Sequence, residues 1–230
     1  MSVAQTSWQL LLQSAKSRRT CISKKYGLMK MEVIKTIDRL IHIYDKPVER
    51  SLKKVTPVIT PLYRDWINES RFLVIATVGP EGCDCSPRGD LANLVKIHDN
   101  KTIWVPDWKG NNRLDSLKNI VRDGRVSLMF MVNGCNNVVR INGDAVISTD
   151  NETIDSFQRK GNLPKTVIVV SVGEVYFQCA KALMRSELWS AKNLALQLPT
   201  AGDFSKEQDA DFDSVAYDNG YEEYAKSRFW

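Results

Sequence analysis

Short polar turns separate most of the segments that the sequence predicts to be β-strands, and this feature constrains the fold more than any other. Since parallel strands need a crossover of a dozen or more residues, strands joined by such turns must be antiparallel. The turns lie at residues 79–82, 99–100 and 133–136, and the strands that they join are predicted over residues 72–78 and 83–88, 94–98 and 102–106, and 125–132 and 138–148. The sequence therefore predicts a mainly antiparallel sheet, most economically closed into a barrel that removes its edges.

Helices are predicted before, between and after these strands. An apolar stripe at helical spacing predicts a helix over residues 31–44. A second helix begins at Pro61 after an N-cap at Thr60. Its inner side is predicted to carry Leu62, Trp66 and Ile67. Further helices are predicted over residues 113–122, 150–161 and 180–189, and two last strand segments over residues 166–172 and 174–178. The fold class is thus mainly β with helices.

Composition and charge limit the classes of protein to which this chain can belong. The 230 residues suffice for one domain with a full core, and their 43% hydrophobic content is that of an ordinary globular protein. The net charge of +5 is uneven, because residues 1–31 carry +6 and residues 203–230 carry −5. The excess therefore belongs mostly to the leader rather than to a binding face, and a nucleic-acid partner becomes a weak alternative. No apolar run is long enough to span a bilayer, so no membrane partner is expected.

The chain divides into three parts by composition. Residues 1–30 are basic and lack acids, which is typical of an organelle transit peptide or of a disordered extension, and we favour the extension. Residues 31–190 hold the predicted helices and strands. Residues 191–230 form an acidic tail rich in aromatic side chains, which we expect to dock on the domain or on a dimer partner. The odd number of five cysteines favours reduced thiols and a cytoplasmic protein.

The segment from residue 105 to residue 119 carries the first candidate site. It leaves a strand and enters the helix predicted at Arg113, with Asn112 as N-cap. A helix N-terminus leaves backbone N–H groups unpaired and favours an anion. Arg113, Lys109 and the amides of Asn111 and Asn112 add further donors, so a phosphate-sized anion would fit. Taken alone, the segment is more typical of an ordinary capped helix with a solvated basic turn.

Two further clusters carry candidate ligand-binding side chains. The pentapeptide at residues 86–90 ends a strand with Arg88 free to hold a phosphate through two hydrogen bonds, although a surface Arg–Asp turn is the more ordinary interpretation. In the helix at residues 180–189, Lys181, Arg185 and Trp189 share one face. That face suits an aromatic ligand or a subunit interface, and it equally suits a solvated surface.

No cluster combines a nucleophile with a base or shows the spacing of a metal site, so the catalytic residues stay unassigned and no metal is predicted. The chain has only two histidines, and no motif places either of them near Ser86 or Ser116. This chain has side chains that could bind an anion but no nucleophile paired with a base and no metal site. That combination is more typical of a protein whose chemistry resides in a bound cofactor.

The clusters occur in an order that resembles a known family. Cys-Ser-Pro-Arg-Gly-Asp at 85–90, Val-Pro-Asp-Trp-Lys-Gly-Asn-Asn-Arg-Leu-Asp-Ser-Leu-Lys-Asn-Ile at 105–120, Arg-Val-Ser-Leu-Met-Phe at 125–130 and Val-Arg-Ile-Asn-Gly at 139–143 are similar to motifs of the pyridoxamine 5′-phosphate oxidase-like FMN-binding proteins. The segment Lys-Ala-Leu-Met-Arg-Ser-Glu-Leu-Trp at 181–189 resembles an uncharacterised bacterial branch of that group. The resemblance covers about residues 35–190.

The resemblance implies an FMN-binding split β-barrel of antiparallel Greek-key type, a homodimer, and FMN in a cleft between the subunits. It assigns the FMN phosphate to Arg88, Asn111, Arg113 and Ser116, with Ser86 and Asn112 in the same motifs. It places Val105, Pro106 and Asp107 along the flavin ring and lets Lys181 or Arg185 reach the same cleft. The C-terminal motifs with which authentic oxidases hold pyridoxamine phosphate have no match here, so vitamin B6 oxidation is not implied.

The functional expectation is an FMN-dependent oxidoreductase of unassigned substrate, acting with a small-molecule substrate or electron donor. One alternative keeps the fold and replaces FMN with a deazaflavin, as a deazaflavin-dependent reductase. The other is a non-catalytic flavin store or sensor.

Overall fold

The computed structural model describes residues 32–44, 46–92, 94–190 and 197–229. The leader predicted over residues 1–30 lies outside them. The chain forms two units, one ending at Val48 and one beginning at Glu49. In the first unit, α2 (Ile37–Ile43) is shorter than the helix predicted over 31–44 and buries none of its residues. The oxygen of the Thr36 side chain caps it by accepting a hydrogen bond from the Arg39 amide. Among the described residues, no helix has the length and apolar character needed to cross a membrane.

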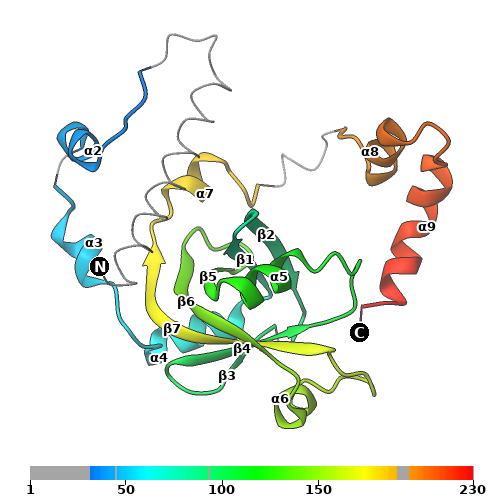
Figure 1. Ribbon diagram of the computed structural model, residues 1–230, viewed down its shortest axis with the longest axis horizontal. Coiled ribbons are helices and arrows are strands. Elements are labelled where there is room, and N and C mark those ends of the chain that lie inside the picture. Colours follow the sequence, from blue (N-terminus) through cyan, green and yellow to red (C-terminus); the bar gives the residue numbers. More distant parts are fainter. Residues whose placement is uncertain (1–31, 45, 93, 191–196, 230) are drawn as a thin grey trace, which may run out of the picture. The chain divides into compact units, whose positions relative to one another are not determined.

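The second unit is built on an antiparallel sheet of seven strands, as the short turns predict (Figure 1). Their order across the sheet is β2-β1-β5-β6-β7-β4-β3, which leaves β2 and β3 as edges. The sheet is therefore not closed by hydrogen bonds, in contrast to the closed barrel that the turns favour. The strands are β1 (Phe72–Gly79), β2 (Gly82–Gly89), β3 (Lys96–Ile97), β4 (Thr102–Asp107), β5 (Arg125–Met131), β6 (Val138–Ser148) and β7 (Thr166–Gln178).

Buried residues alternate with more exposed ones along β1 and β5, which form the middle of the core. In β1, Leu73 and Ile75 are fully buried, and in β5 Leu128 and Phe130 are fully buried beside them. Alternate residues of a strand point to one face of the sheet, so these side chains gather on the same side. The side chain of Ile120 packs into this cluster from a helix that covers the sheet. The sheet thus provides a rigid base for the segments that leave its ends.

Most helices of this unit are shorter than the sequence predicts, and one residue predicted to face the core is exposed instead. The helix α4 (Pro61–Glu69) begins as expected after Thr60, but Leu62 is 81% exposed whereas Ile67 is 1% exposed. The prediction for the inner side is confirmed for Ile67 and for Trp66, which packs partly buried against the core, and is wrong for Leu62. The remaining helices are α3 (Glu49–Lys53), α5 (Asp115–Arg122), α6 (Asn151–Asp155), α7 (Lys181–Arg185), α8 (Ala201–Gln208) and α9 (Ser214–Lys226).

The strand β7 runs unbroken for 13 residues, where the sequence predicts two segments. Gly173, between the two predicted segments, is accommodated by a shift in the pairing of β6 with β7 between Asn142 and Gly143. A Cβ on Gly143 would lie 2.0 Å from the backbone oxygen of Ser171, so the two strands approach too closely for any other residue. The result is one long strand rather than two segments.

The helix α5 lies on β1 and starts two residues later than predicted. Its N-cap is Leu114, in the left-handed conformation at φ 61°, and not Asn112, which also has a positive φ of 58°. The Asn119 side chain fixes the helix to the sheet, because its Nδ2 donates to Thr77 Oγ1 at 3.2 Å. Gly79 permits this contact, since a Cβ there would lie 2.3 Å from the Asn119 oxygen. This packing directs the start of α5 toward β2.

Candidate functional site

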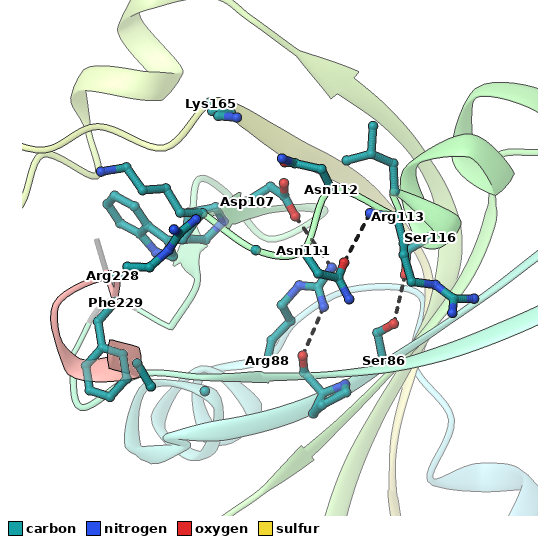
Figure 2. A pocket seen from close by; sticks show the side chains of 18 of the residues that line it. Ser86, Arg88, Asp107, Asn111, Asn112, Arg113, Ser116, Lys165, Arg228 and Phe229 are labelled. Atoms are coloured by element: carbon teal, nitrogen blue, oxygen red, sulfur yellow. Dashed lines mark hydrogen bonds and ion pairs between the residues drawn. The ribbon is translucent and has the colours of Figure 1, made fainter. Parts of the chain in front are cut away.

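A cavity of about 1770 Å³ lies where β2, the end of β4 and the start of α5 meet, and α9 also lines it (Figure 2). The β2 side chains reach it by alternation: Asp84, Ser86 and Arg88 are half-buried, while the residues between them are exposed. Pro106 and Asp107 line it from the end of β4. The open sheet thus curls until its outer strand and its next-to-last strand face one another across the cavity.

The Arg88 guanidinium joins these two strands. It donates to the backbone oxygen of Pro87 at 2.9 Å and lies 3.5 Å from Asp107 Oδ1, and about three quarters of its side chain is buried (25% exposed). Burial raises the pKa of Asp107, and the charges of Arg88 and Lys165 oppose that rise. Arg88 is therefore held in place inside the cavity, next to a carboxyl group that is poorly solvated.

Asp84 organises the inner part of the cavity and is the functional residue that the sequence analysis missed. Its Oδ2 accepts hydrogen bonds from Ser86 Oγ at 2.8 Å and from Ser116 Oγ. The hydrogen bond from Ser116, followed by that from Ser86, lowers the pKa of Asp84 against the effect of burial. Both hydroxyl protons are thus directed to Asp84 rather than into the cavity. Its position two residues before Ser86 on a strand was the available signal, since both side chains must share a face.

The segment between β4 and α5 presents polar groups to the cavity. Asn111 Oδ1 accepts a hydrogen bond from the Arg113 amide at 3.1 Å, and Arg113 Nε donates to Asp115 at 2.8 Å. The Arg113 side chain is 76% exposed, in contrast to that of Arg88. Asn112 and Leu114 both adopt left-handed backbone conformations, which cost free energy outside glycine and cluster at ligand-binding sites. The backbone turns in this way around the N-terminus of α5.

The structure brings most of the predicted cofactor-binding residues together and leaves three apart. Those lining the cavity are Ser86, Arg88, Pro106, Asp107, Asn111, Asn112, Arg113 and Ser116. Val105 is instead fully buried in the core. Lys181 and Arg185 lie on α7 and do not line this cavity within the single chain. Trp189, predicted on their helical face, lies beyond the end of α7, and its Nε1 donates to the Cys135 oxygen at 2.9 Å.

The donor set of the cavity suits a phosphate ester attached to a polar or aromatic group. Six lysine or arginine residues line it against four aspartates, which leaves an excess of positive charge. Two buried polar atoms of lining residues, Trp108 Nε1 and Thr166 Oγ1, have no hydrogen-bond partner among the described residues. Such atoms are rare and call for a missing partner. In the same residues, no group of three or more His, Cys, Asp or Glu side chains is placed to hold a metal ion.

Comparison with known proteins identifies the family. The sequence model of the pyridoxamine 5′-phosphate oxidase family matches residues 59–179, which include every strand and the residues of β2, β4 and α5 described above. The chain therefore belongs to the pyridoxamine 5′-phosphate oxidase family, and its antiparallel sheet with helices is the split-barrel fold of that family. No protein of curated function matches the chain.

Several solved structures are similar to part of the chain at low identity. HupZ of Group A Streptococcus is 22% identical, with 51% of this chain and 91% of that chain covered and a TM-score of 0.43. General stress protein 26 of Bacillus anthracis is 14% identical over 50% of this chain and 88% of that chain, with a TM-score of 0.38. An FMN-binding protein of Syntrophomonas wolfei is 11% identical over 50% of this chain and 88% of that chain, with a TM-score of 0.37. At these TM-scores the likenesses add nothing about ligand or activity.

Proposed function

We propose that this protein binds FMN in the cavity between β2, β4 and α5 and acts as an FMN-dependent oxidoreductase of unassigned substrate. The observation that supports this most is the pair of cationic side chains, Arg88 and Arg113, that reach one cavity from two different elements beside the N-terminus of α5. Membership of the family gives the same expectation for the ligand.

The residues fit the cofactor in three respects. Arg88, Arg113 and the Asn111 amide would hold the phosphate, since charge-assisted hydrogen bonds suit its oxygens. The backbone N–H groups at the start of α5 would add donors. Pro106 and Asp107, at the end of β4, would lie along the ring, and the Asp107 carboxylate, 3.5 Å from Arg88, would lie on the side of the ring toward the phosphate. Bound FMN would supply hydride or single-electron transfer, which the side chains of the cavity do not provide by themselves.

The two serines, which line the cavity, also connect two of its elements. Because Ser86 and Ser116 donate to Asp84, their contribution is to hold β2 against the first turn of α5. Asp84 thereby fixes the spacing between the two cationic elements. We further propose that the protein is a homodimer, as its family suggests, in which Lys181 and Arg185 of α7 serve the site of the other subunit.

The test compares FMN with riboflavin, which carries the same ring and lacks the phosphate. Binding is measured by flavin fluorescence on the full-length protein. We expect one FMN per chain and an affinity for FMN at least tenfold above that for riboflavin, because about 1.4 kcal/mol of phosphate contact corresponds to a factor of ten. Equal affinity for the two flavins, or none for either, would overturn the proposal. Bleaching of the bound flavin by a reduced nicotinamide would separate an oxidoreductase from a flavin store.

A further inference from the structure

The C-terminal helix α9 lines the cavity with a single face. Its lining residues recur at helical spacing and comprise Ala216, Tyr217, Gly220, Tyr221, Tyr224 and Ala225, and just beyond the end of the helix Arg228 and Phe229 also line the cavity. Residues three, four and seven positions apart share a face of a helix, so this is one continuous surface. Three tyrosines and a phenylalanine on that surface remain between 38% and 57% exposed. The face therefore presents aromatic rings to a space that the described residues do not fill.

Gly220 lies in the middle of this face, and nothing in the packing requires a glycine there. A Cβ at Gly220 would meet no atom within 4 Å, and its backbone is not among those with a positive φ. Glycine is nevertheless among the least favourable residues in a helix interior. Its effect here is to leave a flat floor between the rings of Tyr217, Tyr221 and Tyr224. A flat floor with aromatic sides admits a planar ring, as close approach to a backbone commonly requires glycine.

The helix is held in position from its other side. Asp218 accepts hydrogen bonds from the Gly202 amide at 2.9 Å and from the Thr200 hydroxyl, which tie α9 to α8. Tyr217 packs between Phe212 and Tyr221, with ring centroids 5.3 and 5.5 Å apart. The aromatic face is thus built by the hairpin of α8 and α9 and does not need a ligand to form.

A positive charge stands at the end of this face. The Arg228 guanidinium lies over the Tyr224 ring, 5.1 Å from its centroid, so the ring holds it in place. Figure 2 shows Arg228 and Phe229 at the side of the cavity opposite Ser86 and Ser116, with Arg88 and Asn111 between them. The proposed phosphate position and Arg228 are therefore separate cationic points of one cavity.

The size of the cavity leaves room for two molecules. Pockets that hold one small ligand enclose roughly 300–1,000 Å³. This cavity, which is partly open to solvent, has a volume of about 1770 Å³. We propose that α9 forms a second binding site in the cavity, which takes a planar aromatic molecule with a negative charge: its ring lies on Gly220 between the tyrosines, and its anionic group pairs with Arg228. The proposal deepens the proposed function by naming the class of substrate, and it rests on that function only for the presence of the cofactor beside it.

The experiment uses naphthoate and naphthamide, which share a planar ring and differ in charge. Calorimetric titrations are made on the full-length protein with and without saturating FMN. We expect naphthoate to bind at least tenfold more tightly than naphthamide, and Arg228→Gln to remove that difference while leaving naphthamide and FMN within twofold of wild type. Arg228→Lys, which keeps the charge, should retain most of the preference. Failure of naphthoate to bind wild type in either state, or equal weakening of both probes by Arg228→Gln, would overturn the proposal.

Gly220→Ala separates a ligand role from a structural one. The substitution should raise the melting temperature, because alanine favours the helix, and should weaken both probes at least threefold, because the methyl group occupies the floor. Asn219→Ala is the matched control: Asn219 is exposed on α9, does not line the cavity, and gains helix propensity in the same way. Unchanged binding of both probes to Gly220→Ala would refute the proposal. Binding of naphthoate as described without any binding of FMN would refute the proposed function alone.

Discussion

The two arginines proposed to hold the phosphate should differ strongly in their contribution to FMN affinity. Arg88 is 25% exposed and held by Pro87 and Asp107, so its guanidinium is already ordered before a ligand arrives. A hydrogen bond to a charged group in such surroundings is worth about 1.5–3 kcal/mol. We therefore expect Arg88→Ala to weaken FMN binding roughly 10- to 100-fold.

Arg113 should matter much less. Its side chain is 76% exposed, and Nε is already paired with Asp115 at 2.8 Å. Exposed ion pairs contribute about 0.2–1 kcal/mol and weaken with salt, so Arg113→Ala should cost roughly two- to fivefold, and less at high ionic strength. From the sequence alone, nothing indicates which of the two arginines contributes more to FMN affinity.

The assay is flavin fluorescence titration with FMN and riboflavin at two salt concentrations. Riboflavin affinity should stay constant in both variants, because it lacks the phosphate. Part of the loss in Arg88→Ala arises because the Asp107 carboxyl is left without its partner beside the phosphate. The double variant Arg88→Ala/Asp107→Asn should therefore bind FMN more tightly than Arg88→Ala. A larger loss in Arg113→Ala than in Arg88→Ala, or a parallel loss of riboflavin, would refute this reasoning.

Three further predictions concern single residues of the same region. Asp107→Asn should tighten FMN binding by roughly two- to tenfold and riboflavin binding by less, since it removes a negative charge near the phosphate. Because burial raises the pKa of Asp107, chemical denaturation should show wild type losing stability relative to this variant as the pH rises from the ordinary pKa of the group to the raised one. Gly79→Ala should destabilise the fold by about 1–3 kcal/mol, because its Cβ would collide with Asn119, and an unchanged melting temperature would contradict the packing of α5. Asp84→Asn should destabilise the protein more at pH 7 than at pH 3, because the lowered pKa of Asp84 stabilises the fold above its ordinary range and that contribution is lost as the pH falls; a pH-independent difference in melting temperature would argue against the serine hydrogen bonds.

Much of the fold follows from local sequence signals, and the exceptions have physical causes. The hairpin of β1 and β2 and the pairing of β5 with β6 follow from turns that allow only antiparallel neighbours. The single long β7 was not predictable, because the shift at Gly143 depends on its partner strand. The start of α5 was misplaced at Asn112, since capping preference favours asparagine, whereas the chain uses left-handed turns at Asn112 and Leu114.

The candidate site was predictable where one strand or one loop determines it. Ser86 and Arg88 share a face of β2, and Asn111 and Arg113 share a loop, so their proximity within each pair follows from sequence. That β2 and β4 meet across the cavity depends on the curl of the whole sheet. The cavity-lining face of α9 was also missed, because the aromatic residues of the tail predicted docking without indicating helices or a position.

The ion pair between Arg88 and Asp107 connects two strands, β2 and β4, that are not hydrogen-bonded neighbours in the sheet. The strand β2 has a hydrogen-bonded neighbour on one side only, β1, and across its other edge Arg88 reaches Asp107 of β4. Any anion bound to Arg88 and to the start of α5 bridges chain segments that the backbone ladder leaves unconnected. Ligand binding then stabilises the curled arrangement by mass action, and β2 is the strand whose amide hydrogens should exchange more slowly when the site is filled. We therefore expect the approach of β2 to β4 to become more stable when the cavity is filled.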